Sequence, residues 1–192
     1  MDCRALAFRQ LPHQPKLFLD YVDQFEKVKA FYGHPPTLDA VMRTANKVDY
    51  PSDRRAKVSV ILQRQNAEFG AGSATASNLE RLGNGAVAVM SGQQVGLFGG
   101  PAYSIYKALM AVQIAEELTR GGIDAVPVFW MATEDHDLEE VRHATWFEGG
   151  KLTRFELPDG NEAGKPVGRI PLGAEVEGFA QEAAESLRNQ GG

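Results

Sequence analysis

The chain has 192 residues, of which 43% are hydrophobic and 23% charged, values typical of a soluble domain with a sizeable core. Its formal net charge is −5 and no segment carries a basic stripe, which argues against a nucleic-acid-binding protein. The single cysteine, Cys3, cannot form a disulfide within the chain, which fits a reducing compartment.

The sequence carries neither an export signal nor a membrane span. Charged residues interrupt the first 20 positions, so a continuous apolar signal region is absent. The longest apolar stretches, Ala86–Met90 and Ala125–Ala132, are far shorter than the roughly 20 residues that a transmembrane helix needs. We therefore expect a cytoplasmic protein without a membrane partner.

The first part of the chain has the apolar spacing of helices. One helix is expected to begin near Leu17 and to end at Gly33, since glycine and the prolines that follow it stop the pattern. A second helix is expected over Leu38–Ala45. Asp53 is expected to cap a third, which the small residues of Gly70–Ala76 should end.

A strand–helix–strand pattern follows. Ala86–Met90 and Ala125–Met131 are short apolar runs typical of buried strands, and Ser91–Pro101 between them is rich in glycine. An amphipathic helix follows this loop and should end at Gly121–Gly122. Its apolar face is expected to hold Ile105, Ala108, Leu109, Val112, Ala115 and Leu118. The pattern predicts one parallel, right-handed βαβ unit.

The C-terminal part is predicted to contain a hairpin and a helix. Lys151–Leu157 is expected to pair with Val167–Leu172 around a turn at Pro158–Gly164, and Glu175–Asn189 should be helical. One βαβ unit with a hairpin is an incomplete doubly wound sheet, so the chain resembles part of a larger domain. The expected parts are a helical segment, 1–82, a βαβ unit of a Rossmann-like core, 83–150, and the start of a connecting segment, 151–192.

The first candidate site is the glycine-rich loop and the helix after it. Ligands of open α/β folds bind beyond the carboxyl ends of the strands, and a helix N-terminus after Pro101 offers unpaired N–H groups to an anion. Gln93 and Gln94 add amide groups, and Lys107 adds a positive charge. Neither a Walker loop nor the dinucleotide fingerprint is present. The alternatives are a glycine turn that only permits close packing, and a solvated Lys107.

The second candidate site is the acidic run that follows the second strand, Thr133–Glu140. Carboxylates this close must be protonated, paired with a cation or bound to one. A general acid/base role is expected for His136, with Glu134, Asp135 or Asp137 orienting it or binding a substrate amine. The alternative is a solvated charged face, which the position at the end of a buried strand disfavours.

A metal site is a weaker alternative. If residues 136–143 are helical, His136, Glu140 and His143 share one helix face and could bind a divalent cation. The H-E-x-x-H pattern is absent, however, and Arg142 can pair locally with the acids. The sequence therefore favours a site without a metal.

Three segments resemble the bacillithiol biosynthesis cysteine-adding enzyme family. They are MSGQQVGLFGGPAYSIYKAL (Met90–Leu109), VPVFWMATEDHDLEEVRH (Val126–His143) and KPVGRIPL (Lys165–Leu172). The resemblance implies an α/β, Rossmann-like core with a parallel sheet similar to that of nucleotidyltransferases. It also implies a ligase that joins cysteine to glucosaminyl malate, and a homodimer formed through a C-terminal coiled coil.

The resemblance also implies which residues line the pocket. From the first motif they are Gln93, Gln94, Gly99, Gly100, Tyr103 and Lys107; from the second, Glu134, Asp135, His136 and Asp137. The activating cofactor is not identified by these residues. Joining a carboxylate to an amine is uphill without activation, so the reaction class and the implied fold point to ATP or another nucleotide.

Family chains are several hundred residues longer, so we expect the rest of the sheet and the coiled coil to be missing from this truncated chain. Catalysis is then expected to need the missing parts. Two other functions remain open. One is a different nucleotide-dependent transferase on the same fold, which would turn over nucleotide without cysteine. The other is a non-catalytic small-molecule binding fragment, which an unpaired, exposed sheet edge would favour.

Overall fold

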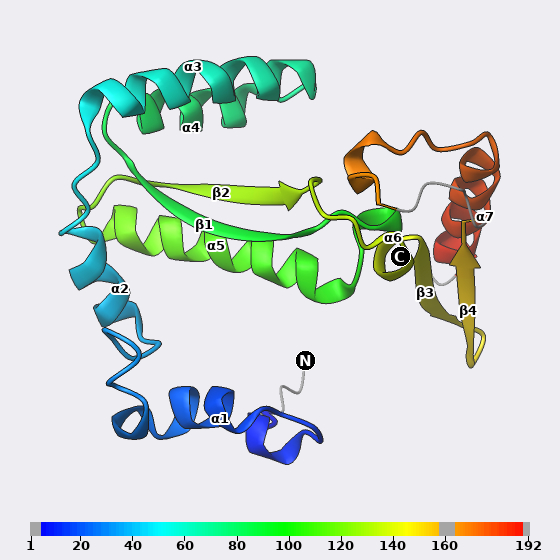
Figure 1. Ribbon diagram of the computed structural model, residues 1–192, viewed down its shortest axis with the longest axis horizontal. Coiled ribbons are helices and arrows are strands. Elements are labelled where there is room, and N and C mark those ends of the chain that lie inside the picture. Colours follow the sequence, from blue (N-terminus) through cyan, green and yellow to red (C-terminus); the bar gives the residue numbers. More distant parts are fainter. Residues whose placement is uncertain (1–4, 158–163, 190–192) are drawn as a thin grey trace. The chain divides into compact units, whose positions relative to one another are not determined.

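The computed structural model describes residues 5–157 and 164–189, and its contacts divide into two compact units (Figure 1). Unit 1 is formed by residues of 1–87 and 117–125, and unit 2 by residues of 88–116 and 126–192. Cys3, and residues 158–163 of the expected turn, lie outside the described residues.

Unit 1 is helical, as the sequence predicts. Its elements are η1 (Phe8–Gln10), α1 (Lys16–Asp23), η2 (Phe25–Lys27), α2 (Leu38–Ala45), α3 (Ser52–Glu68) and α4 (Ser73–Gly83). The hydroxyl of Thr37 caps α2 by accepting a hydrogen bond from the Ala40 N–H (3.3 Å). α3 and α4 lie side by side and pack against each other (Figure 1).

Three details of these helices differ from the prediction. α1 ends at Asp23 because the chain turns back and brings the Tyr32 ring to 4.6 Å from the Tyr21 ring. One continuous helix would separate these residues by roughly 16 Å. Pro51, not Asp53, stands before the first residue of α3. The Gly70–Ala76 break is shorter than expected, since α4 already begins at Ser73.

Two arginines connect these helices to the start of the strands. Arg55 of α3 donates hydrogen bonds to the main-chain oxygens of Leu82 (2.8 Å) and Ala86 (3.0 Å). Arg81 of α4 pairs with the carboxylate of Asp124 and donates to the main-chain oxygen of Ala125 (2.9 Å). These bonds satisfy carbonyl groups at the helix end and at the beginning of β2.

The predicted βαβ unit is present. β1 (Val87–Gln94) and β2 (Ala125–Ala132) pair and run in the same direction, and α5 (Ala102–Arg120) connects them (Figure 1). The glycine stop is confirmed: Gly122 has a φ of 86°, and the Ile123 N–H returns to the Leu118 oxygen (2.9 Å). β1 runs to Gln94, four residues beyond the expected end.

The buried face of α5 matches the predicted one only in part: Ala115 and Leu118 are buried as predicted. Its buried residues are Ser104, Ala111, Ala115 and Leu118. Ile105, Leu109 and Val112, which the sequence assigns to the apolar face, are 60%, 51% and 38% exposed. Apart from Leu118, the buried residues of α5 have small side chains.

The remainder of unit 2 contains a hairpin, but not the predicted one. α6 (Leu138–Val141) leads into β3 (His143–Glu148), which pairs antiparallel with β4 (Lys151–Glu156). Gly149 and Gly150, at φ 55° and 83°, form the two-residue turn between them. The expected pairing of Lys151–Leu157 with Val167–Leu172 is therefore wrong, and η4 (Val167–Arg169) is a 3-10 turn.

A small aromatic core holds the hairpin. Trp146 and Phe155 stack at 3.9 Å, and Phe155 meets Phe98 edge-on at 6.4 Å and Phe179 at 5.8 Å. Phe179 belongs to α7 (Glu175–Asn189), whose extent the sequence predicts correctly, and the Trp146 indole donates to the Ser186 hydroxyl (2.9 Å). No helix among the described residues is long and apolar enough to cross a bilayer.

Candidate functional site

Lys107 connects α5 to the end of β1. The sequence places Gln93 and Gln94 in a loop, whereas the structure makes them the last residues of β1. The Lys107 ammonium donates to the main-chain oxygen of Gly92 (3.2 Å) and to Gln93 Oε1 (2.8 Å), and lies 5.2 Å from the centre of the Tyr103 ring. Its charge is therefore held at the strand end, although the Lys107 side chain is exposed, so the alternative of a solvated Lys107 stays open.

The glycine-rich turn before α5 has an unusual backbone. Phe98, Gly99 and Gly100 follow one another with φ values of 54°, 89° and 74°. This left-handed region is open to glycine but strained for Phe98, at a cost of about 1–3 kcal/mol that surrounding contacts must offset. A Cβ on Gly96 would lie 3.0 Å from the Gly100 Cα. The turn therefore closes tightly on itself, directly before the N-terminus of α5.

The loop after β2 is shaped by its own carboxylates. Asp135 Oδ1 accepts hydrogen bonds from the N–H groups of His136 (2.7 Å) and Asp137 (3.2 Å). Asp137 Oδ1 in turn accepts from the Glu140 N–H (3.0 Å) and caps α6. The bond from the Asp137 N–H, followed by those from the His136 N–H and a neighbouring amide, lowers the pKa of Asp135 below its ordinary value. Asp135 is therefore ionised at neutral pH.

Polar side chains join the two motifs. Lys107 donates to the Gln93 carbonyl oxygen, and the Gln93 amide nitrogen donates to Gln94 Oε1. The Gln94 side-chain amide also contributes to the lowered pKa of the Asp135 carboxylate. Because an ammonium only donates, its bond to Gln93 Oε1 fixes the orientation of the Gln93 amide, and the bond from the Gln93 nitrogen then fixes that of Gln94. We call this row of four residues the polar relay; it contains members of both predicted pocket motifs.

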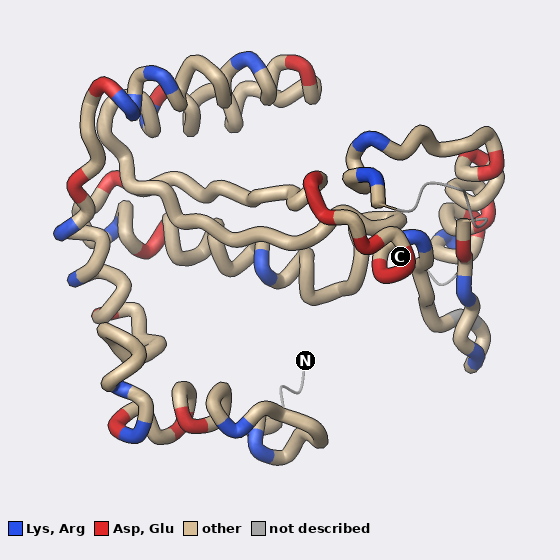
Figure 2. The backbone as a smooth tube through the Cα atoms, in the orientation of Figure 1, with Lys and Arg blue, Asp and Glu red and all other residues tan. Residues whose placement is uncertain are grey.

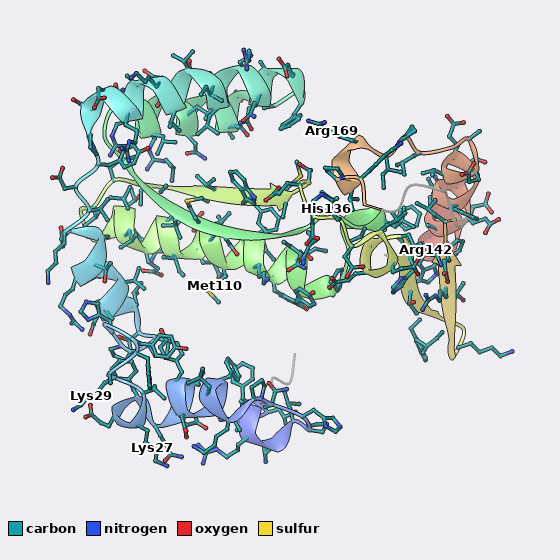
Figure 3. All side chains as sticks on the ribbon, viewed as in Figure 1. Lys27, Lys29, Met110, His136, Arg142 and Arg169 are labelled. Carbon is teal, nitrogen blue, oxygen red and sulfur yellow. The ribbon has the colours of Figure 1, made fainter. Side chains whose placement is uncertain are left out.

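The other acidic-motif residues are more exposed. The Glu134 carboxylate accepts from the Trp130 indole (3.4 Å). The His136 ring has no hydrogen-bond partner among the described residues, so no neighbouring acid fixes its tautomer. His136 and the acidic residues of this loop lie at the end of β2 (Figures 2 and 3). The structure thus leaves the His136 side chain exposed to solvent.

A third segment, which sequence reasoning did not place at the site, docks on the loop after β2. The Val167 N–H donates to the Asp135 main-chain oxygen (2.7 Å) and the Gly168 N–H to the Thr133 oxygen (2.9 Å). A Cβ on Gly168 would lie 2.6 Å from the Thr133 Cβ, so only glycine fits this approach. The one available signal was the glycine inside KPVGRI. Arg169, next in the chain, is exposed and also lies near the end of β2 (Figure 3).

Unit 2 also contains a cavity of about 670 Å³ with largely apolar walls. The walls include Val95, Leu97, Leu138 and Val141, and none of the ten predicted pocket residues. Two wall residues, Arg142 and Glu175, are charged. Arg142 is held by Glu139 (3.0 Å), Glu156 (2.8 Å) and the Leu157 oxygen (2.8 Å). The cavity therefore does not coincide with the polar site that the sequence predicts.

The metal site considered from the sequence, with His136, Glu140 and His143 as ligands, is not formed. α6 ends at Val141, and His143 begins β3, where its Nδ1 lies 3.2 Å from the Glu139 oxygen. His136, Glu140 and His143 therefore do not share a helix face. Within residues 5–157 and 164–189, no group of three or more metal-binding side chains is gathered.

Comparison with known proteins identifies the family. Residues 1–191 match the family model described as Bacillithiol biosynthesis BshC, N-terminal Rossmann-like domain. The chain belongs to the BshC family. This confirms the family resemblance seen in the three motifs and the Rossmann-like class of the fold.

Relatives with BshC names cover nearly the whole chain. A protein of Koribacter versatilis named "Putative cysteine ligase BshC" is 39% identical over 187 residues, which are 97% of this chain and 35% of that protein. The BshC protein of Solibacter usitatus is 40% identical over 176 residues (91% and 32%), and that of Salinibacter ruber 34% over 181 residues (90% and 32%). The chain thus spans about a third of the length of these relatives.

Proposed function

We propose that this chain is the N-terminal part of a BshC ligase that joins cysteine to glucosaminyl malate in bacillithiol biosynthesis. Its BshC membership and the relatives' cysteine ligase names support this proposal. The observation that carries it is the polar relay, because it joins residues of both motifs where two parallel strands end.

The polar relay and the residues around it suit amide-bond formation. The ionised carboxylate of Asp135 attracts the amine of the acceptor, with Glu134 and Asp137 adding negative charge. His136, exposed beside them, removes the proton that the attacking amine loses. Gln93 and Gln94, oriented by Lys107, position the substrate.

Activation is assigned to the glycine turn. A bound nucleotide such as ATP would transfer a phosphoryl or nucleotidyl group to a carboxylate oxygen of cysteine, with release of ADP or pyrophosphate. That oxygen would then leave as part of the phosphate or AMP when the amine attacks the carbonyl carbon. Gly99, Gly100, Tyr103 and the N-terminus of α5 suit the phosphate or carboxylate, because glycine backbone and unpaired N–H groups approach anions closely.

The remaining two thirds of the relatives' length are proposed to complete the site and the sheet. We propose that the whole protein is a cytoplasmic homodimer formed through a C-terminal coiled coil. A nucleotidyltransferase-like strand order of the completed sheet is part of the same proposal.

The direct test uses the purified whole protein with cysteine, glucosaminyl malate and ATP, with products followed by mass spectrometry. Formation of the cysteinyl amide, dependent on all three reactants, supports the proposal. Nucleotide turnover that needs neither cysteine nor glucosaminyl malate would instead indicate a different nucleotide-dependent transferase and refute it.

A further inference from the structure

A buried hydroxyl of α5 lacks a hydrogen-bond partner. Ser104 is 6% exposed, and its Oγ has no partner among the described residues. Buried polar groups in folded proteins are nearly always hydrogen-bonded, and exceptions often mark a place for a water, an ion or a ligand. Ser104 is the third residue of α5, so its hydroxyl lies in the first turn of a 19-residue helix.

The hydroxyl faces the glycine turn. A Cβ added to Gly100 would lie 3.6 Å from Ser104 Oγ and would meet no other side chain within 4 Å. The Ser104 N–H is bonded to the Pro101 oxygen (2.8 Å), while the earlier N–H groups of the first turn have no preceding helical carbonyl. An unpaired hydroxyl, unpaired N–H groups and the positive end of α5 thus converge beside Gly99 and Gly100.

The backbone beside the hydroxyl carries no side chain at Gly99 or Gly100. Gly99 and Gly100 have positive φ values, 89° and 74°. Glycine adopts positive and negative φ about equally readily, because it has no Cβ. Phe98, directly before the two glycines, also has a positive φ, 54°.

We propose that the Ser104 hydroxyl and the first two N–H groups of α5, those of Ala102 and Tyr103, bind an oxyanion of the substrate or its activator, a carboxylate or a phosphate. The N–H groups of Gly99 and Gly100 already donate to the Gly96 (3.2 Å) and Leu97 (3.0 Å) oxygens, so these glycines leave room for the anion without binding it. The Lys107 ammonium, which the sequence assigns to this anion, is held by Gly92 and Gln93 instead. The anion is thus bound mainly by neutral donors and the helix N-terminus. The assignment of this anion to the substrate or its activator rests on the proposed function.

The chain offers a matched control. Ser59 is likewise buried, at 7%, and its hydroxyl also lacks a partner among the described residues. It also lies near a glycine, since a Cβ on Gly83 would be 3.5 Å from Ser59 Oγ. Ser59 is in the middle of α3, however, where every N–H group has a helical partner. Ser59 is therefore about as buried as Ser104 but does not lie at a helix N-terminus.

The test compares Ser104→Ala, Ser104→Thr and Ser59→Ala in the whole protein. Affinities for inorganic phosphate and for L-malate are measured by calorimetry, and Tm is measured without and with each probe. Ser104→Ala should weaken binding roughly ten-fold or more, since a hydrogen bond to a charged group is lost. Without a probe, the Tm of Ser104→Ala should equal or exceed that of the unaltered protein. Ser104→Thr, which keeps the hydroxyl, and Ser59→Ala should bind as the unaltered protein does.

A preference for phosphate would assign the site to the nucleotide, and a preference for malate to a substrate carboxylate; either supports the proposal. Wild-type affinity in Ser104→Ala, or binding of neither probe to the unaltered protein, would overturn it. The readout is binding without turnover, so it is independent of the proposed ligase reaction. A protein that binds phosphate through Ser104 but forms no cysteinyl amide would refute the function and keep the site.

Discussion

The docking of Gly168 on the loop after β2 leads to a quantitative prediction. In Gly168→Ala the new Cβ would lie 2.6 Å from the Thr133 Cβ and 3.1 Å from the Thr133 oxygen. The two segments must separate by about 1 Å to reach ordinary contact distance. That movement breaks or weakens the bonds from Gly168 to Thr133 (2.9 Å) and from Val167 to Asp135 (2.7 Å).

The expected cost is about 1–3 kcal/mol, because each of the two hydrogen bonds contributes about 0.5–1.5 kcal/mol. Hydrogen exchange at the amides of Val167 and Gly168 should therefore accelerate about 5- to 150-fold in the whole protein. Since the same bonds hold the Asp135 loop, Gly168→Ala should also lower the rate of cysteinyl amide formation.

Gly178→Ala is the matched control. Gly178 lies inside α7 and a Cβ there would meet nothing within 4 Å. Alanine should then stabilise the helix by about 0.5–1 kcal/mol, the opposite sign. Unchanged exchange at residues 167 and 168 in Gly168→Ala would show that the close approach to Thr133 does not hold this segment.

Three further predictions concern the polar relay and the acidic loop. Lys107→Met should free the amides of Gln93 and Gln94 and lower kcat/KM about ten-fold, because one charge-assisted hydrogen bond is lost. The Tm should change less. As the control, Lys57→Met removes an exposed lysine of α3 and should change neither kcat/KM nor Tm. Asp135 has a lowered pKa in the fold, so its stabilisation is complete above pH 3.8 and is lost as the pH falls below that value. In Asp135→Asn, acid unfolding curves should lack this contribution, and an identical curve would contradict it. His136→Ala should lower turnover by about 100-fold or more with little change in Tm; unfolding without a separate catalytic defect would make His136 structural.

Local patterns made most elements of the fold predictable. The βαβ unit, the Gly121–Gly122 stop and the extent of α7 follow from apolar spacing and glycine chemistry within a few residues. The β3–β4 hairpin was missed although Gly149–Gly150 is a strong turn signal. A second apolar run, Val167–Leu172, offered a competing partner, and pairing depends on contacts that local sequence does not contain.

The site was predictable only in part for the same reason. Position after a strand indicates that Gln94 and Asp135 belong to one sheet edge, and in the structure the Gln94 side chain contributes to the lowered pKa of Asp135. The docking of Gly168 and the unpaired hydroxyl of Ser104 depend on distances between segments. A serine on a helix or a glycine in a loop gives no such distance from sequence alone.

The most direct test of the central claim is mass spectrometry of thiols in cells with and without the gene. The account predicts that deletion removes bacillithiol and accumulates glucosaminyl malate, and that the whole gene, but not its His136→Ala form, restores the pool. An unchanged bacillithiol pool in the deletion strain would contradict the assignment of this chain to the cysteine-adding step.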